Sequence, residues 1–284
     1  GLVEAGSRGW SSSLALASLI GGGGLIGFFV HHESRAAEPI LPLRLLTHST
    51  RSAANLARGL LYAGMYGMAF FLTQFLQDVQ RFTPLVAGVA FLPMPTSVFL
   101  FSQLTARVLL RRFPQKSLMM VGATVVTMGL LFATRINSST SYAQVLVSMV
   151  LVGMGMGISF VSFTSASLAD VPPEDAGAAS GLVNMSQQLG AAVGLAVLVT
   201  AFDAATRHVV LGAQHVTQAG AIAHANAILV HGLDNVFALS AVFGAAALAT
   251  VVFGVRSLAQ SAPAPVVEIE RADEEVPWLQ NEAG

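Results

Sequence analysis

The sequence has no cysteine and few charged residues. Of its 284 residues, 10% are charged and 54% are hydrophobic, whereas soluble domains carry about 25% charged residues. The absence of cysteine excludes disulfides, thiolate metal sites and cysteine nucleophiles. Fourteen Lys+Arg residues nearly balance fifteen Asp+Glu residues, which excludes electrostatic binding of nucleic acid. This composition predicts a polytopic membrane protein.

Seven stretches contain no Asp, Glu, Lys or Arg and have lengths close to or above the roughly 20 residues that a membrane helix needs. Because backbone groups in lipid must be hydrogen-bonded within their own segment, each stretch is predicted to be a helix. The predicted fold class is therefore an all-α integral membrane protein. The seven stretches are Leu14–Val30, Leu60–Gln77, Phe82–Ala106, Leu118–Thr134, Tyr142–Ala169, Ala176–Phe202 and Asn235–Val255.

The basic residues fall mostly on one side of these predicted spans. Since cytoplasmic loops carry the excess of Lys and Arg, we expect the N-terminus outside and the C-terminus in the cytoplasm. The side predicted to be cytoplasmic holds Arg35, Arg44, Arg51, Arg58, Arg107, Arg111, Arg112, Lys116, Arg256 and Arg271, and the other holds Arg8, Arg81, Arg135 and Arg207.

Four regions follow from this topology. Residues 1–13 form an extracellular polar segment, and residues 14–54 form a central transmembrane helix with a cytoplasmic loop. Residues 55–256 form a C-terminal transmembrane bundle. Residues 257–284 contain prolines and a run of acidic residues, which is typical of a disordered tail.

Amide and tyrosine side chains within the spans are the best candidates for a substrate cavity. Polar groups in hydrocarbon are costly unless they face protein or water. The amides at positions 184, 187 and 188 are three or four residues apart, so they lie broadly on one helix face. The candidate cavity residues are Tyr62, Tyr66, Gln74, Asn184, Gln187 and Gln188.

Two prolines and two glycines are candidates for a hinge or gate. Pro93 and Pro95 lie in the middle of a predicted span, where they mark either a hinge or an ordinary bend. Gly153 and Gly157 have the spacing of a seam that lets two helices pack closely, and a gating role is the alternative.

Neither catalytic nor metal-binding residues are expected. The histidine pairs are adjacent or seven residues apart, whereas zinc ligands on a helix are usually three or four apart. No nucleophile elbow or phosphate-binding loop is present. We therefore expect no enzyme activity, no metal and no cofactor.

The stretch Leu168-Ala-Asp-Val-Pro-Pro-Glu-Asp-Ala-Gly-Ala-Ala-Ser-Gly-Leu-Val-Asn-Met-Ser-Gln-Gln-Leu-Gly190 resembles the cytoplasmic turn and penultimate helix of the fourteen-helix drug:proton antiporters of the major facilitator superfamily. Pro39–Leu46, followed by Ser52–Leu56, is similar to the loop that enters the ninth helix of that family. Phe82–Pro93 resembles the start of the tenth helix. The resemblance covers about residues 1–256.

This resemblance implies a C-terminal six-helix bundle preceded by one central helix. It also implies alternating-access export of small molecules across the plasma membrane, with the proton gradient as energy source. The partners would be the small-molecule substrate, the lipid bilayer and the missing N-terminal half of the transporter. The implied proton carrier lies in that half or at a boundary residue such as Asp78 or Asp234. Alternatives are a non-transporting scaffold or sensor, and uptake instead of export.

The loop between the second and third bundle helices departs from the family pattern. It keeps a basic cluster, but Leu110 and Pro114 stand near where the family has a carboxylate and a glycine. We expect this cluster to anchor the loop to anionic headgroups. It consists of Arg107, Arg111, Arg112 and Lys116.

Overall fold

The computed structural model describes residues 13–36, 41–42, 44–211 and 218–255, and these residues form helices and connecting loops without any strand. The all-α prediction is confirmed. The predicted polar segment 1–13, except Ser13, and the predicted tail 257–284 lie outside the described residues.

Six of the predicted spans coincide with helices of the described residues that are long and apolar enough to cross a membrane. The first predicted span lies in α2, a helix of 21 residues, and its crossing of the bilayer stays a prediction. The elements are α2 (Ser13–Glu33), α3 (Arg44–Thr47), α4 (Ser49–Gln74), the π-helix η1 (Phe75–Val79), α5 (Pro84–Phe91), α6 (Pro93–Leu104), the π-helix η2 (Thr105–Leu109), α7 (Leu110–Arg112), α8 (Gln115–Ala133), α9 (Tyr142–Leu168), the 3-10 helix η3 (Pro173–Asp175), α10 (Ala176–Leu211) and α11 (Gln218–Gly254).

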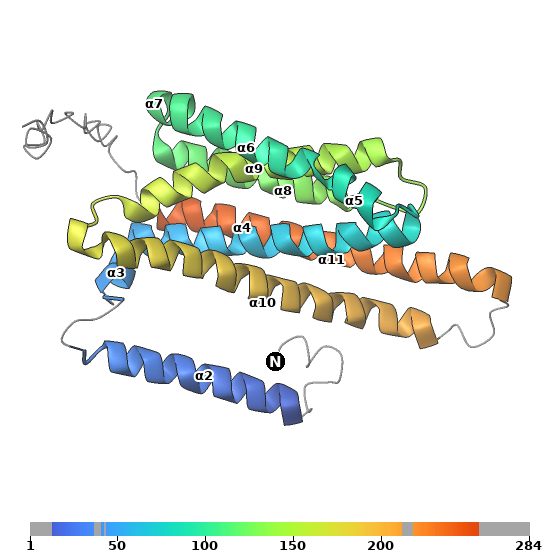
Figure 1. The fold of residues 1–284 in the computed structure, drawn as a ribbon, viewed down its shortest axis with the longest axis horizontal. Helices are drawn as coiled ribbons and strands as arrows, with labels where there is room; N and C mark the ends of the chain where they lie inside the picture. The colour runs from blue at the N-terminus through green and yellow to red at the C-terminus, as the bar shows by residue number, and fades with distance from the viewer. Residues whose placement is uncertain (1–12, 37–40, 43, 212–217, 256–284) are drawn as a thin grey trace, which may run out of the picture.

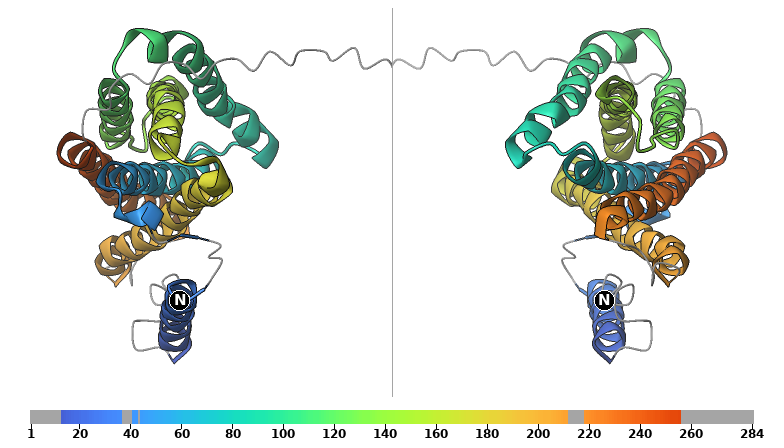
Figure 2. Two further views of the ribbon diagram at one scale, coloured as in Figure 1. Left: turned by 90° about the vertical axis from the view of Figure 1, so that its left-hand side faces the viewer. Right: turned by 90° about the vertical axis from the view of Figure 1, so that its right-hand side faces the viewer.

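Helices α4 and α9 lie at the centre of the bundle (Figure 2). Helix α4 packs against α10 and α11, and α9 packs against α6 and α8. In α4 and α9, 61% of the most apolar stretch is buried within the chain, against 22% in the α5–α7 span and in α10. Met68, Phe71, Met119, Met149 and Phe237 belong to the shared core. Helix α2 lies apart from this bundle, beyond α10 (Figure 1).

Glycines set the closest helix contacts. A Cβ added at Gly153 would lie 2.5 Å from the Met94 carbonyl oxygen, and one at Gly157 would lie 2.6 Å from the Val98 carbonyl oxygen. Both contacts join α9 to α6. A Cβ at Gly190 of α10 would lie 2.1 Å from the Gly59 carbonyl oxygen of α4. These approaches support the packing interpretation of the glycines, and gating stays a prediction.

The helical hydrogen bonds of the predicted span Phe82–Ala106 are interrupted at Pro93. Helix α5 ends at Phe91 and α6 begins at Pro93, because proline lacks the N–H that would continue the helical hydrogen bonds. The Ser97 hydroxyl donates to the Pro93 carbonyl oxygen over 2.8 Å. Pro95 follows within the first turn of α6. The backbone of Leu92 stays helical, so only the hydrogen bonding is interrupted here, and use of this place as a hinge stays a prediction.

Helix α4 begins earlier than its charge-free stretch indicates. It starts at Ser49 and, with η1, spans 31 residues to Val79, or about 46 Å at 1.5 Å per residue. The hydrocarbon core of a bilayer is about 30 Å thick. Arg58 lies six residues, or about 9 Å, from the middle of this span. Arg58, which the charge-free stretch left outside, therefore lies within the helix and is buried in the bundle.

Helices α10 and α11 also extend past their charge-free stretches. With 36 and 37 residues, each exceeds the roughly 20 residues that a bilayer requires. They consequently include Asp203 and Asp234, which the charge-free stretches left outside. Both helices project together at one end of the bundle (Figure 1).

The described basic residues lie at opposite ends of the bundle, as predicted from the loops. Arg44 precedes α4, and the basic cluster joins α6 to α8, at the end where α3 and α7 lie (Figure 1). Arg81 and Arg135 lie in the loops at the other end. Arg8, Arg256 and Arg271 are outside the described residues. Which end faces the cytoplasm stays a prediction.

Candidate functional site

One face of α4 carries polar and aromatic side chains from near its start to Tyr66. Arg51, Asn55, Arg58, Tyr62 and Tyr66 follow one another at intervals of three or four residues, which places them on the same side of a helix. All but Tyr66 are buried. We call Arg51, Asn55, Arg58 and Tyr62 the α4 seam. Arg51, Asn55 and Arg58 form hydrogen bonds to α9, to Ala169 just after it, or to α10. Tyr62 contacts Arg58 within α4.

Arg58 is the centre of this seam and is only 2% exposed. Its Nη1 donates to the Thr164 hydroxyl of α9 over 2.6 Å, and its Nη2 donates to Gln187 Oε1 of α10 over 3.3 Å. Its guanidinium carbon lies 5.6 Å from the ring centre of Tyr62 and 5.0 Å from that of Phe160. Two neutral acceptors and two aromatic faces therefore surround the cation.

No acidic side chain of the described residues lies within ion-pair distance of Arg58. Its Nε is buried and has no hydrogen-bond partner in the described part of the chain. A buried cation without a counter-ion is costly, and cation–π contacts offset only part of that cost. Arg58 is thus the least compensated charge of the seam.

Arg51 binds the end of α9. Its Nε donates to the Ser167 carbonyl oxygen over 3.0 Å, and its Nη2 donates to the Ala169 carbonyl oxygen over 3.1 Å. The last carbonyls of a helix lack partners within the helix and carry partial negative charge. Arg51 satisfies two such carbonyls and holds α4 against α9.

Asn55 joins all three helices of the seam. Its Oδ1 accepts hydrogen bonds from the Ser167 hydroxyl of α9 over 3.2 Å and from the Ser186 hydroxyl of α10 over 3.5 Å. Its Nδ2 is buried and has no partner among the described residues. The seam therefore fixes the positions of α9 and α10 relative to α4.

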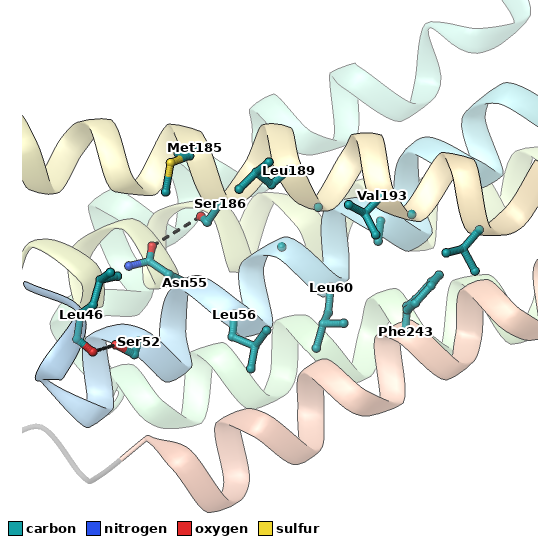
Figure 3. A pocket seen from close by; sticks show the side chains of 15 residues that line it. Leu46, Ser52, Asn55, Leu56, Leu60, Met185, Ser186, Leu189, Val193 and Phe243 are labelled. Atoms are coloured by element: carbon teal, nitrogen blue, oxygen red, sulfur yellow. Dashed lines mark hydrogen bonds between the residues drawn. The ribbon is translucent and has the colours of Figure 1, made fainter. Parts of the chain in front are cut away.

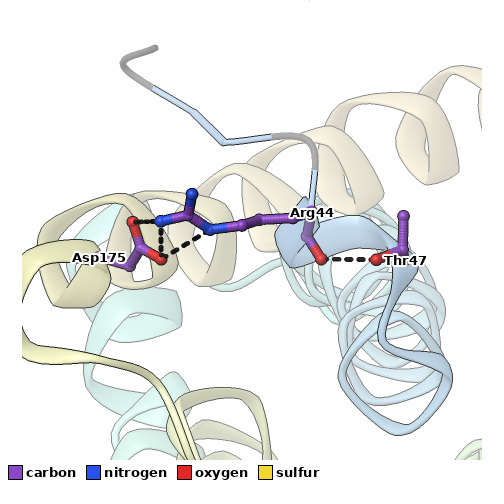
Figure 4. A network of polar contacts seen from close by, with 3 residues as sticks. All are labelled: Arg44, Thr47 and Asp175. Carbon is purple, nitrogen blue, oxygen red and sulfur yellow. Dashed lines mark hydrogen bonds and ion pairs between the residues drawn. The ribbon is translucent and has the colours of Figure 1, made fainter. Parts of the chain in front are cut away.

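A bidentate ion pair links the chain before α4 to the turn before α10 (Figure 4). Arg44 Nη2 lies 3.0 and 2.8 Å from the two carboxylate oxygens of Asp175, and its Nε lies 3.2 Å from one of them. The Asp175 side chain is 6% exposed, whereas that of Arg44 is 66% exposed. Water can therefore solvate the Arg44 guanidinium, whereas the buried Asp175 carboxylate relies on Arg44 to compensate its charge.

The structure places two of the six predicted cavity residues against Arg58 and a third beside one of these two. Tyr62 and Gln187 contact it directly, and the rings of Tyr62 and Tyr66 lie 6.1 Å apart. Asn184 and Gln188 lie exposed on α10, and Gln74 is half-buried at the end of α4. That any of the six lines a cavity stays a prediction.

A groove between α4 and α10 is lined mostly by aliphatic side chains, in contrast to the surroundings of Arg58. Its volume is about 460 Å³, and Leu56, Leu60, Leu189, Val193 and Phe243 are among its lining residues (Figure 3). None of the six predicted cavity residues lines it. Asn55 of the seam and Ser186 also line it, but its other walls are mostly aliphatic and suit contact with acyl chains. We therefore place the candidate site at Arg58 on the seam and not in this groove.

The basic cluster differs from the seam in exposure. Arg107, Arg111 and Arg112 are exposed, and Lys116 donates to the Val252 carbonyl oxygen over 3.0 Å. In the described parts of the chain, no three histidine or acidic side chains gather in a way that could hold a metal ion.

Sequence reasoning missed Arg58 because the charge-free stretch was taken to begin after it. The spacing from Arg51 through Asn55 and Arg58 to Tyr62 is the signal that could have found it. These intervals continue one helix face, so they already indicated that Arg58 belongs to the helix.

Six membrane-length helices among the described residues define a polytopic helical membrane protein. The sequence model of the Major Facilitator Superfamily matches residues 2–195. The chain belongs to this superfamily, which confirms the recognised resemblance and the predicted fold.

Its relatives include proteins of drug resistance and export. The chain is 32% identical over 201 residues to the puromycin resistance protein pur8 of Streptomyces alboniger, covering 70% of this chain and 40% of the relative. It is 34% identical over 209 residues to the probable actinorhodin transporter of Streptomyces coelicolor, covering 71% and 36%. It is 32% identical over 176 residues to the multidrug efflux pump LfrA of Mycolicibacterium smegmatis, covering 62% and 35%. The chain therefore spans less than half the length of these relatives.

Proposed function

We propose that this chain is the C-terminal half of a proton-coupled exporter of small molecules that works by alternating access. Its bundle would rock against an N-terminal half, and the two would enclose the substrate between them. The membership of the superfamily and the names of the relatives support transport as the activity. The N-terminal half and the bilayer are the partners that this proposal requires.

The observation that carries the proposal is the uncompensated cation on α4. Ionisable residues at membrane depth face a bundle interior or a water-filled path and mark functional sites. Arg58 is buried in a helix that is long and apolar enough to cross a membrane, and Tyr66 and Phe160 beside the seam are 39% and 43% exposed. A face that combines exposed rings with buried polar groups is typical of a small-molecule site.

Transport by the chain alone and by the assembled transporter tests the proposal. Ethidium efflux would be measured in cells that make this chain with and without an N-terminal half, before and after an uncoupler. We expect proton-dependent efflux only with both halves. Robust efflux by the chain alone would contradict the division into halves, absence of efflux from the pair would favour a scaffold or sensor, and accumulation would favour uptake.

The proposed orientation has its own test. The chain has no cysteine, so single cysteines can be placed at Ser117, beside the basic cluster, and at Ser138, in the loop at the other end of the bundle. With the predicted excess of basic residues in the cytoplasm, an impermeant maleimide added to intact cells should label Ser138→Cys and spare Ser117→Cys. The reverse labelling would invert the orientation, and labelling of both would contradict a membrane-spanning bundle.

A further inference from the structure

Arg58 is held by groups that an incoming ligand can replace. Its contact with Gln187 is a single hydrogen bond of 3.3 Å, which is near the long limit for such bonds. Thr164, the other acceptor, also donates to the Phe160 carbonyl oxygen over 2.6 Å, so its hydroxyl keeps a partner without Arg58. Gln187 is only half-buried, so water can hydrate its amide.

One of the two aromatic rings beside the guanidinium is partly exposed. The Phe160 ring centre lies 5.0 Å from the Arg58 guanidinium carbon, and its side chain is 43% exposed. A rotation of Phe160 about its side-chain torsions, which exposed residues make in nanoseconds or less, would remove one of the groups that cover the cation. Tyr62 would remain beneath it.

We propose, building on the proposed transport function, that Arg58 binds a carboxylate-type anion on an aromatic molecule. Guanidinium groups pair with carboxylates through two parallel hydrogen bonds, and the Nε that lacks a partner would serve one of them. The aromatic part of the ligand would pack against Phe160 and Tyr66. In the assembled transporter, a carboxylate side chain of the N-terminal half is the competing source of such an anion, and titration of the complete pair of halves distinguishes the two.

Two probes of equal shape test this inference on the purified chain in detergent. 2-Naphthoate carries the anion, and 2-naphthamide replaces it with a neutral amide on the same ring system. We expect 2-naphthoate to bind at least tenfold more tightly than 2-naphthamide. Equal affinities would overturn the proposal, because a merely apolar site would not discriminate between these probes.

Variants then assign the preference to Arg58. Arg58→Gln should abolish the preference for 2-naphthoate without weakening 2-naphthamide, and Arg58→Lys should retain part of it, because lysine keeps the charge but not the planar pair of donors. The matched control is Arg107→Gln, which removes an exposed arginine and should leave both affinities unchanged. Retention of the preference in Arg58→Gln, or its loss in the control, would contradict the assignment.

Titration of the complete pair of halves distinguishes the two sources of the anion. If 2-naphthoate keeps its preference there, the transported molecule supplies the anion. If the preference disappears and returns when one membrane carboxylate of the N-terminal half is neutralised, that side chain supplies it. If the preference disappears and no neutralisation of a membrane carboxylate restores it, the proposal is overturned for the transporter. The binding measurements do not depend on efflux, so a failure of the transport function would be seen separately.

Discussion

Two groups of arginines near the same end of the bundle have opposite environments. In the α4 seam, Arg51 and Arg58 are 6% and 2% exposed and contact α9 or α10. In the basic cluster, Arg107, Arg111 and Arg112 are exposed around α7. All of these arginines carry the same charge. Whether an arginine bonds to neighbouring helices or lies at the surface depends on which face of its helix it occupies.

The largest loss of stability is expected from Arg51→Ala. This change removes two hydrogen bonds to the buried end of α9 and leaves the Ser167 and Ala169 carbonyls without their partner. Hydrogen bonds that involve a charged group contribute about 1.5–3 kcal/mol each, so we expect a loss of about 3 kcal/mol. Thermal unfolding of the purified chain in detergent measures it, with Arg107→Ala as the control. Similar losses for the two variants would erase the distinction between seam and cluster.

A smaller loss is expected from Asp175→Asn. The change removes the charge of a buried carboxylate and leaves an amide that cannot accept both arms of Arg44. Because Arg44 is largely exposed, the water around it screens the pair, and we expect about 1–2 kcal/mol. A double-mutant cycle with Arg44→Gln isolates the pair, and a coupling energy near zero would show that Asp175 is stabilised by other contacts.

Arg58→Met is expected to change stability by at most about 1 kcal/mol, with an increase as the favoured direction. Replacing a buried ion by an apolar residue of similar size is often neutral or stabilising, and Thr164 keeps its bond to Phe160. A variant that is as stable as the original but has lost the preference for 2-naphthoate would identify Arg58 as a functional residue. Thermal unfolding and naphthoate titration on the same preparation check this, and a loss as large as that of Arg51→Ala would make Arg58 a structural residue.

Much of the fold could be predicted from the sequence because the lipid requires it. Stretches without charge must be helical in a bilayer, so six predicted spans coincide with membrane-length helices. The ends of the helices were less accessible to this reasoning. A charge ends a charge-free stretch but not a helix, so α4 begins at Ser49 and α10 continues to Leu211.

The candidate site could be predicted only in part. Tyr62 and Gln187 stood out as polar residues within apolar stretches, and both contact Arg58. That Gln187 reaches Arg58 depends on the crossing of α4 with α10, where Gly59 and Gly190 approach closely. A pattern along one helix does not give the crossing of two helices. The environment of Arg58 therefore required the structure.

The smallest effect on stability is expected from neutralising the basic cluster. Arg107, Arg111 and Arg112 are exposed, and surface substitutions usually change stability by less than about 0.5 kcal/mol. Their attraction to anionic lipid, at about 1 kcal/mol per residue near the surface, should disappear in the triple Gln variant. Adding phosphatidylglycerol to the detergent micelles should raise the thermal unfolding midpoint of the original chain more than that of the variant. Equal increases would show that the cluster does not bind headgroups, whereas a large loss in pure neutral detergent would place these arginines with the seam.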